Sequence, residues 1–586
     1  MTTLSPEQQA IIDAPLDPLS VVACAGSGKT LTAVRRLIEV RKRLGDHRGR
    51  VALLSFSNVA VKTFQSKYQA LAQNLPAGIG RDRIEIDTLD GFITSNILRP
   101  HAYRTMGTTR TAFLVMGNEP FLKRFTFKVS YSLEEESHPL CITKMHIGLQ
   151  TEDVCFYYAN NNQKVALDTA YALNIVNCLG RNGAYTHNLG RYWCHRVLSE
   201  QPAILRALAR RYPHILIDES QDINTLHQAI LEQLMKAGTK ISLIGDPSQG
   251  IYEFAGANCD FLTQYEQRPA IKNYALTRNY RSVPSIVELA NNLSGRSDTA
   301  DRAAPETLPG AFFIAYKNEN AERERLVAAF GAAVLAAGLK RQCSAILCRG
   351  RGDLLNELSG NAPIGQGLVK GFAKAAILRD KLQDYLSAFE TIASCVAGLL
   401  ADPPDNLVAM ITRPASYPEA RSLRREVWKF TRNQDTGLPS ALLAAKSRWH
   451  TLLLERSRNF LALLQDRFDL ETADNLGRKL AKTKLLDAPL MVGGDLVTAQ
   501  DARIRVDTVH QVKGESLDAV LYLAARKDVV ALLGGVKTEE GRIGYVAVTR
   551  ARNLLWLGVP ANSLEELRPE LLSRGFQEHL LSPSHP

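Results

Sequence analysis

Cysteine is scarce in this chain of 586 residues and forms no metal-binding pattern. None of the 9 cysteines belongs to a CxxC pair, and the closest two, Cys343 and Cys348, have no second cluster. Structural zinc sites and iron–sulfur clusters need grouped thiolates, so neither is expected. An odd number of cysteines also argues against a disulfide framework. We expect reduced thiols that pack as small apolar side chains.

Long apolar runs and targeting segments are also missing. The sequence has no run of about 18 apolar residues, which a membrane-spanning helix requires. The first residues, 1–7, contain neither a basic stretch nor an apolar run, so no signal peptide is expected. These absences predict a cytoplasmic protein with no membrane partner.

The length and the charge point to a large protein with a polyanionic partner. A chain of 586 residues exceeds what one hydrophobic core supports, so roughly three or four domains are expected. The hydrophobic fraction of 45% and the charged fraction of 22% are ordinary for a globular protein. The formal net charge of +11 favours nucleic acid as a partner, although many basic proteins never bind it.

Short apolar runs bounded by turn residues predict two sets of buried parallel strands. Helical patterns separate the runs, and this alternation indicates doubly wound α/β domains. The first set is 20–23, 51–55, 215–217 and 241–244, and the second set is 344–348, 519–523 and 554–558.

Two long segments interrupt these sets. The first, about 93–199, mixes strand-like runs with helical patterns, whereas the second, about 352–492, has Leu, Ala, Lys and Arg at helical spacing. The predicted fold class is therefore α/β, with two parallel-sheet domains that each carry an inserted accessory domain, the first mixed α/β and the second mainly helical. In the first insertion we expect strands at 125–131, 141–145 and 154–158 and helices at 165–178 and 191–198. The predicted domains are 1–92 with 200–272, its insertion 93–199, then 273–351 with 493–586, and its insertion 352–492.

A glycine-rich segment, ACAGSGKT at 23–30, follows the first apolar run and precedes a helical pattern at 31–44. Small residues let backbone N–H groups surround phosphates, and the N-terminus of a helix adds positive potential. This setting predicts a nucleotide site in which Lys29 reaches the β- and γ-phosphates and Thr30 binds Mg²⁺. The residues expected to hold ATP in this loop are Ala25, Gly26, Ser27, Gly28, Lys29 and Thr30.

Two adjacent carboxylates, Asp218 and Glu219, follow the apolar run at 215–217. Burying carboxylates is costly unless a partner compensates them, and a complex of Mg²⁺ with a nucleotide would do so. We expect Asp218 to hold the metal through water and Glu219 to accept a proton from the attacking water.

The segment GDPSQGIYEFAGA at 245–257 also follows an apolar run. Gln249 in this segment is expected to sense the γ-phosphate. Tyr252 and Phe254 lie close to it in sequence, and aromatic side chains near a basic groove suit base stacking, worth about 1–3 kcal/mol per base. Core packing is the alternative for both rings. His510, in the segment TVHQVKG, is by itself more typical of a structural histidine.

Two arginine motifs, NYRS at 279–282 and VTRAR at 548–552, lie far apart in the sequence. Phosphoryl transfer places negative charge on the oxygens of the γ-phosphate. An arginine that enters from a second domain stabilises this charge and accelerates hydrolysis by roughly 10³–10⁵-fold. Arg281 and Arg550 are the candidates for this role.

Taken in order, these segments resemble the UvrD/Rep-like branch of superfamily 1 helicases. LSPEQQ at 4–9 resembles the adenine-reading glutamine motif, and SFSNVA at 55–60 and DTLDGF at 87–92 resemble motifs Ia and Ib. DESQD has the DExQD form of this branch. GDPSQGIYEFAGA, LTRNYRS, TVHQVKG and EEGRIGYVAVTRAR resemble motifs III to VI. The resemblance covers both parallel-sheet domains.

The resemblance implies two RecA-like P-loop NTPase domains and an ATP- and Mg²⁺-dependent helicase. Such an enzyme moves 3′→5′ on single-stranded DNA and acts at junctions of single and double strands. Gln8 would contact adenine, Tyr280 would stack on it, and Arg281 and Arg550 would face the γ-phosphate. The implied single-strand path is lined by Phe56, Asn58, Thr88, Tyr252, Phe254 and His510.

Several positions depart from the family pattern. Asp90 stands where motif Ib usually has histidine, which weakens the expected DNA contact there. Phe254 and Ala255 replace a tryptophan and an arginine of motif III, so stacking is kept and one phosphate contact is lost. Ser516 replaces a glutamate of motif V, and whether Glu515 compensates is left open.

Two functions are open on the sequence alone. One is a DNA-stimulated motor in DNA repair or anti-phage defence. The other is an ATP- and DNA-sensing regulatory subunit that controls a separately encoded nuclease and has little unwinding activity of its own. The retained aromatic residues favour the motor, and the lost contacts favour the sensor. A P-loop kinase or GTPase would leave both arginine motifs unexplained.

Overall fold

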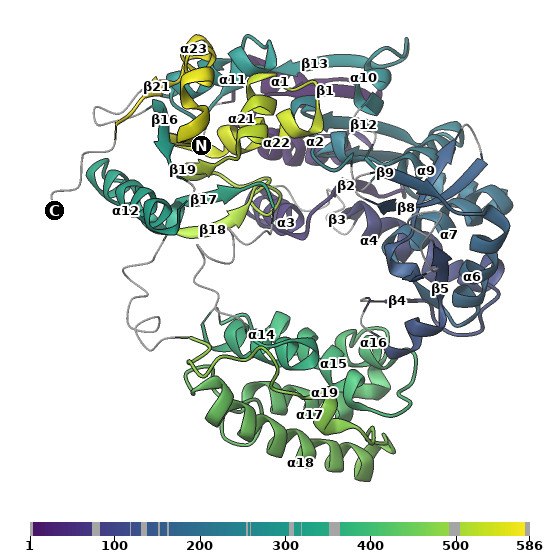
Figure 1. Cartoon of the computed structure of the whole chain (residues 1–586). Helices are drawn as coiled ribbons and strands as arrows, with labels where there is room; N and C mark the ends of the chain where they lie inside the picture. The colour runs from purple at the N-terminus through teal and green to yellow at the C-terminus, as the bar shows by residue number, and fades with distance from the viewer. Residues whose placement is uncertain are drawn as a thin grey trace.

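Two six-stranded parallel sheets organise the chain (Figure 1). The computed structural model describes residues 4–72, 83–115, 117, 119–129, 138–150, 153–160, 163–253, 256–257, 260–303, 310–317, 319–350, 364–381, 383–491 and 504–580. The first sheet has the order β13-β1-β12-β11-β2-β3 and the second β18-β17-β19-β20-β16-β21. Every neighbouring pair in both sheets is parallel, which confirms the α/β class with parallel sheets.

All seven predicted runs overlap strands of these sheets. The other five strands were not predicted, and of these β3, β13 and β18 are only partly buried, so they lack a continuous apolar signal. The first sheet contains β1 (Leu19–Ala23), β2 (Val51–Ser55), β3 (Ile84–Thr88), β11 (His214–Ile217), β12 (Lys240–Gly245) and β13 (Lys272–Leu276). The second contains β16 (Gly310–Tyr316), β17 (Ala345–Cys348), β18 (Arg505–Thr508), β19 (Leu517–Leu523), β20 (Ala551–Pro560) and β21 (Gln577–Glu578).

Both sheets are covered by apolar side chains on both faces. Leu53 and Leu54 are neighbours on β2 yet belong to two different buried clusters. Ile346 and Leu347 on β17 are divided in the same way. Successive side chains of a strand point to opposite faces, so each sheet lies between two apolar layers. The helices along the first sheet are α1 (Pro6–Asp13), α2 (Lys29–Arg43), α3 (Asn58–Ala72), α4 (Leu89–Ile93), α9 (Thr225–Lys236) and α10 (Asp260–Glu266). Those of the second half are α11 (Pro284–Ser294), α12 (Asn320–Ala336), α21 (Arg526–Leu533), α22 (Glu539–Arg550) and α23 (Leu564–Arg574).

The segment between α4 and β11 combines small sheets with helices. Its strands are β4 (Phe113–Leu114), β5 (Thr126–Val129), β6 (His138–Cys141), β7 (His146–Gln150), β8 (Asp153–Asn160), β9 (Gln163–Ala166) and β10 (Ala184–Tyr185). Its helices are α5 (Arg99–Thr105), α6 (Thr169–Arg181), α7 (His187–Glu200) and α8 (Pro202–Arg211). The pairs β5–β6, β7–β8 and β8–β9 are antiparallel, whereas β4 and β10 pair in parallel.

One prediction within this segment was wrong, and another was confirmed except for its first residues. The strand expected at 141–145 is a short 3₁₀ helix, because β6 already ends at Cys141 and the N–H of Met145 turns back to the carbonyl of Ile142. The helix expected from 165 begins at Thr169, because 163–166 form β9 and Asp168 caps the helix through the N–H of Tyr171. The end of the strand predicted at 125–131 lies outside the described residues.

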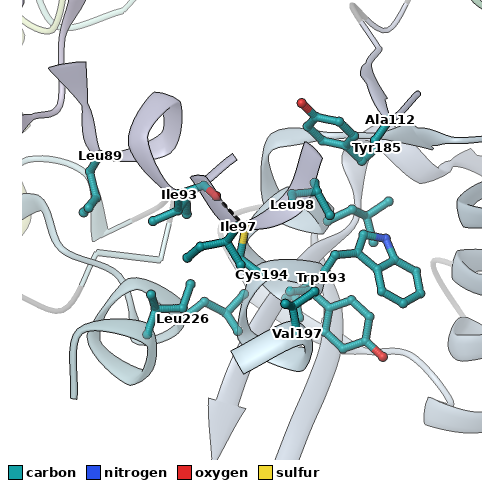
Figure 2. Packing of buried hydrophobic residues seen from close by; sticks show 14 of the residues in the cluster. Leu89, Ile93, Ile97, Leu98, Ala112, Tyr185, Trp193, Cys194, Val197 and Leu226 are labelled. Atoms are coloured by element: carbon teal, nitrogen blue, oxygen red, sulfur yellow. Dashed lines mark hydrogen bonds between the residues drawn. The ribbon is translucent and has the colours of Figure 1, made fainter. Parts of the chain in front are cut away.

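Helix α7 is fixed by dense packing (Figure 2). Trp193, Cys194 and Val197 of α7 are fully buried, and the Cys194 thiol donates to the carbonyl of Ile93 at 3.4 Å. These residues share one cluster with Leu54 of the first sheet. The segment and the first sheet therefore have a continuous core, which holds α7 in a defined position.

A separate helical body lies below the sheets in Figure 1. It consists of α14 (Gly367–Asp380), α15 (Tyr385–Leu399), α16 (Leu407–Thr412), α17 (Arg421–Arg432), α18 (His450–Phe468) and α19 (Leu476–Lys479). Phe372, Ile392 and Trp449 are fully buried in its own core. The domain boundaries stay predictions, and the limits at 352 and 492 lie outside the described residues. Within the described ranges, no helix combines the length and the apolar character needed to cross a membrane.

Short elements complete the fold. A small parallel pair joins β14 (Arg278–Asn279) to β15 (Thr299–Ala300). The 3₁₀ and π segments are η2 (Thr94–Leu98), η3 (Pro120–Arg124), η4 (Ile142–Lys144), η5 (Ser220–Asp222), η6 (Pro247–Gln249), η8 (Arg341–Cys343), η9 (Pro418–Ala420), η10 (Ala445–Trp449) and η11 (Ala561–Ser563).

Candidate nucleotide and nucleic-acid site

The loop between β1 and α2 has the backbone conformation of a phosphate-binding loop. Gly26 and Gly28 have φ angles of +74° and +80°, in the left-handed region that favours glycine. A Cβ at Gly26 would overlap the Cβ of Arg281, and a Cβ at Gly28 would lie 2.7 Å from Nε2 of Gln8. Two other predicted nucleotide residues therefore lie against this loop. Its remaining predicted members are the buried Ala25 and Ser27 and the half-buried Lys29 and Thr30, which begin α2.

Asp218 and Glu219 follow β11 at the carboxyl edge of the first sheet. Nζ of Lys29 lies 4.0 Å from Oε1 of Glu219. Burial, and then the charge of Glu219, raises the pKa of Asp218. Burial would also raise the pKa of Glu219, but Lys29 and Lys513 outweigh this effect and lower it. Of the two carboxylates, Glu219 is therefore held more strongly in the ionised form, which a proton acceptor needs.

The backbone at Glu219 is strained. Its φ of +55° is uncommon for a residue with a side chain, and such a conformation costs about 1–3 kcal/mol. Nε2 of Gln221 donates to the Glu219 carboxylate at 2.5 Å and so holds the side chain in place. Strain of this kind gathers at functional sites, where the surrounding structure maintains it.

The donor set fits a complex of Mg²⁺ with a nucleotide. Oδ1 of Asp218 is buried and has no hydrogen-bond partner among the described residues. A buried acceptor of this kind costs free energy unless a polar ligand satisfies it. Thr30 lies in the first turn of α2, whose N-terminus carries positive potential. Thr30 and Asp218 would hold the metal, and Lys29 would hold the phosphates.

Gln249 and Arg550 meet across the two halves of the chain. Gln249 is buried, and its Nε2 donates to Asp246 Oδ2 at 2.6 Å. Its Oε1 accepts a hydrogen bond of 2.7 Å from Nη2 of Arg550, the last residue of α22. Arg550 is 1% exposed and also donates to the carbonyl of Glu515 at 3.2 Å. The second arginine motif thus reaches the predicted γ-phosphate sensor.

Arg281 occupies the other side of the end of α22. Its Nη1 donates to the carbonyl of Thr549 at 3.0 Å. Burial, and then the neighbouring Arg550, lowers the pKa of Arg281 to about 9, so it stays charged at neutral pH. Both arginines lie close to the phosphate-binding loop and to each other.

The residues expected to read adenine also lie at this loop. The N–H of Tyr280 donates to the carbonyl of Gly26 at 3.0 Å. Nε2 of Gln8 donates to the carbonyl of Ser27 at 3.1 Å, and its Oε1 accepts from the N–H of Ser5 at 3.1 Å. Tertiary contacts thus bring all the predicted catalytic and ATP-binding residues to one place.

The structure describes five of the six predicted DNA-contacting residues. The rings of Tyr252 and His510 lie 5.7 Å apart, and the ring of Phe56 lies 5.7 Å from that of His227. Asn58 is exposed at the start of α3. Thr88 caps α4, since its Oγ1 accepts from the N–H of Gly91 at 2.9 Å. The remaining residue of this set, Phe254, lies outside the described residues.

A pocket of about 340 Å³ lies beside Glu219, the predicted proton acceptor. Phe56 and Tyr252 both line it, whereas Asn58, Thr88 and His510 do not belong to its described lining. The lining residues are Phe56, Ser57, Ala60, Arg191, Glu219, Asp222, Asn224, His227, Tyr252, Ala257, Lys513 and Gly514.

Two ion pairs tie the loop after β12 and the end of the DESQD segment to the second half. Nζ of Lys513 lies 2.6 and 2.7 Å from the carboxylate oxygens of Asp222 and 4.7 Å from the centre of the Tyr252 ring. Arg542 of α22 donates to the carbonyl of Gly250 at 2.6 Å and pairs with Glu253. The pocket and the phosphate site are therefore held by the same contacts between the two halves.

Known proteins match the chain over most of its length. The family model described as the UvrD/REP helicase N-terminal domain matches residues 4–270. The putative ATP-dependent DNA helicase YjcD of Bacillus subtilis (strain 168) is 22% identical, over 95% of this chain and 79% of that protein. The ATP-dependent DNA helicase UvrD2 of Mycobacterium tuberculosis (strain H37Rv) is 22% identical, over 94% of this chain and 77% of that protein.

These matches support a UvrD/Rep-like ATP-dependent DNA helicase. The structure shows what the side chains contact at two positions that depart from the family pattern. The Asp90 carboxylate, in place of the family histidine, accepts hydrogen bonds from Arg191 at 2.6 and 2.8 Å and lies 2.8 Å from Nε2 of His227. The Glu515 carboxylate pairs with Arg505, and only the backbone carbonyl of Glu515 contacts Arg550.

Several residues of the candidate site were not predicted to belong to it. Three of them lie within the family motifs, namely Asp222, Lys513 and Arg542. Their charge inside an otherwise buried motif was the signal that could have identified them. Arg191 and His227 stand outside every motif and carried no such signal. They reach the site because α7 packs against both α4 and α9.

Proposed function

We propose that this chain hydrolyses ATP at the interface of its two parallel-sheet halves and uses the energy to move along single-stranded DNA and separate duplexes. The contact between Gln249 and Arg550 carries the proposal, because it joins the predicted phosphate sensor of one half to the arginine motif of the other. The matches to ATP-dependent DNA helicases support the same activity.

Each residue of the phosphate site has a role that its contacts support. Lys29, half-buried beside Glu219, would neutralise the β- and γ-phosphates. Thr30 and Asp218 would hold Mg²⁺, which when bound offsets charge on the phosphate oxygens. Glu219 would orient the attacking water and accept its proton. Arg281 and Arg550 would stabilise the charge that develops on the transferred phosphoryl group.

The same contacts would couple ATP turnover to movement. Lys513 pairs with Asp222 close to the phosphate site and lies over Tyr252 in the pocket. Ile251, beside Tyr252, is fully buried in the core of the second half. Closure of the halves around ATP would therefore shift Tyr252 against Phe56, and reopening after hydrolysis would release it. This alternation is the hinge mechanism of many ATP-driven enzymes.

Steady-state ATPase activity with and without single-stranded DNA tests the proposal. The matched variant is Glu219→Gln, which removes the proton acceptor and keeps the size of the side chain. Strong DNA stimulation that is lost in the variant is the expected result. Activity that does not respond to DNA would contradict the motor and favour the ATP-sensing regulatory subunit.

The direction and the pathway need separate experiments. We propose 3′→5′ movement from the family resemblance, and displacement of streptavidin from either end of a biotinylated strand tests it. Roles in DNA repair or anti-phage defence, and a nuclease partner, stay predictions of the sequence.

A further inference from the structure

Three helices bring a cluster of polar side chains to the wall of the 340 Å³ pocket. Asp90 lies on α4, Arg191 on α7 and His227 on α9. Arg191 donates to Asp90 through Nε at 2.8 Å and Nη2 at 2.6 Å, and Nε2 of His227 lies 2.8 Å from Asp90 Oδ1. Asp90 therefore holds two of the side chains that line the pocket, Arg191 and His227.

Both of these side chains keep hydrogen-bonding capacity. A guanidinium has five N–H donors, and Arg191 uses three of them, two on Asp90 and one on Asn188 Oδ1 at 3.0 Å. Two donors are left for a ligand. Nδ1 of His227 is buried and has no hydrogen-bond partner within the described part of the chain. The wall of the pocket thus offers donors and an unsatisfied ring nitrogen.

The charges around the pocket compensate one another. Its charged lining residues are Arg191, Lys513, Glu219 and Asp222, two positive and two negative. Lys513 pairs with Asp222. Arg191 pairs with Asp90, and Glu219 pairs with Lys29; these two partners are not in the described lining. Phosphate binding depends on uncompensated positive charge. The pocket is therefore poorly suited to a phosphate and well suited to a neutral polar group.

The dimensions and the aromatic walls fit a planar ring. Ligand pockets range from about 300 to 1,000 Å³, and this one lies at the small end. Phe56 and Tyr252 supply apolar faces. Unstacked bases of single strands are commonly held in this way, with the face on an aromatic side chain and the edge hydrogen-bonded.

We propose, on the basis of the function proposed above, that Arg191, held by Asp90, donates to the edge of the nucleobase that the aromatic residues of the expected single-strand path would hold in this pocket. Arg191 is then a base-contacting residue and Asp90 a positioning residue. The packing of α7 in Figure 2 supports this role, because Trp193 and Cys194 anchor the helix two and three residues beyond Arg191.

Fluorescence anisotropy with two labelled strands of equal length, oligo(dT) and a fully abasic strand, tests the proposal on the full chain. Arg191→Ala should bind oligo(dT) about tenfold more weakly than the wild type, because it loses hydrogen bonds to a base edge. It should bind the abasic strand as the wild type does. Arg206→Ala removes an exposed arginine of the neighbouring α8 and is the matched control. Asp90→Asn should also weaken binding to oligo(dT), but not in the Arg191→Ala background.

Equal weakening on both strands would overturn the proposal, because it would indicate a phosphate contact or a structural role. An unchanged affinity for oligo(dT) would overturn it as well. If thermal unfolding shows that Arg191→Ala is not folded, Arg191→Lys replaces it, since lysine keeps the charge beside Asp90 and lacks the planar fork. Wild-type protein that binds neither strand would instead contradict the proposed function itself.

Discussion

Arg550 and Gln249 lie 301 residues apart in the sequence and share a hydrogen bond of 2.7 Å. Gln249 follows the central strand β12 of the first sheet, and Arg550 ends α22 of the second half. A displacement of one half relative to the other would therefore disturb the hydrogen bond of Gln249, the residue expected to sense the γ-phosphate. This contact makes the arrangement of the two halves part of the proposed catalytic site.

Arg550→Ala is expected to lower the turnover number for ATP by about 10³-fold or more, because arginines in this position stabilise transition-state charge. The affinity for ATP should change far less. ATPase kinetics and titration with a fluorescent ATP analogue measure the two effects. The control is Arg552→Ala, whose side chain is 44% exposed two residues further along. Equal losses of turnover and affinity would contradict the assigned role.

Gly26→Ala is expected to abolish ATP binding. The left-handed φ strains an alanine, and the added Cβ would overlap the side chain of Arg281. Gly238→Ala is the matched control, because Gly238 has a φ of +106° but a Cβ added there would meet no atom within 4 Å. It should cost about 1–2 kcal/mol of stability, since a residue with a Cβ is disfavoured at positive φ, and leave ATP binding unchanged. Similar ATP affinity in the two variants would show that the contact with Arg281 is unimportant.

Lys513→Met is expected to lower the free energy of unfolding by about 3–5 kcal/mol, because it leaves a buried carboxylate without its cation. Asp222 and Lys513 have side-chain exposures of 3% and 7%. The double variant Lys513→Met with Asp222→Leu should regain part of the loss. Urea unfolding measures both values. A single variant as stable as the wild type would mean that the pair makes no net contribution to stability.

The stability of the first sheet should depend on pH through His214. Burial, and then Lys240, lowers its pKa from 6.5 to about 4. The unfolded state therefore binds the proton more tightly than the native state, so stability is fully present above pH 6.5 and is lost as the pH falls towards 4. The loss is about 3 kcal/mol for this shift.

His214→Leu provides the comparison for this pH effect. Its unfolding free energy, measured from pH 7 to pH 4, should fall less steeply than that of the wild type. Parallel curves for the two proteins would show that another group causes the acid sensitivity.

Much of the fold could be predicted because its signals are local. The strand at 51–55 was predicted to the residue, since a buried parallel strand is a continuous apolar run. The strand predicted at 141–145 was wrong, because the antiparallel strand β6 ends at Cys141 and a short 3₁₀ helix follows it. Edge strands such as β3 were not predicted, because a half-buried strand has only a weak apolar pattern.

The sequence by itself determined the loop of Gly26 and Gly28, the carboxylates Asp218 and Glu219, and the central strands that place them. These features depend on residues that are neighbours in the chain. Only the tertiary structure showed that Asp90, which departs from the usual motif Ib, contacts both Arg191 and His227 and lies at the centre of a polar cluster. Their separations of 101 and 137 residues explain the difference. Such contacts form only when helices from distant segments pack together, and no local pattern encodes that packing.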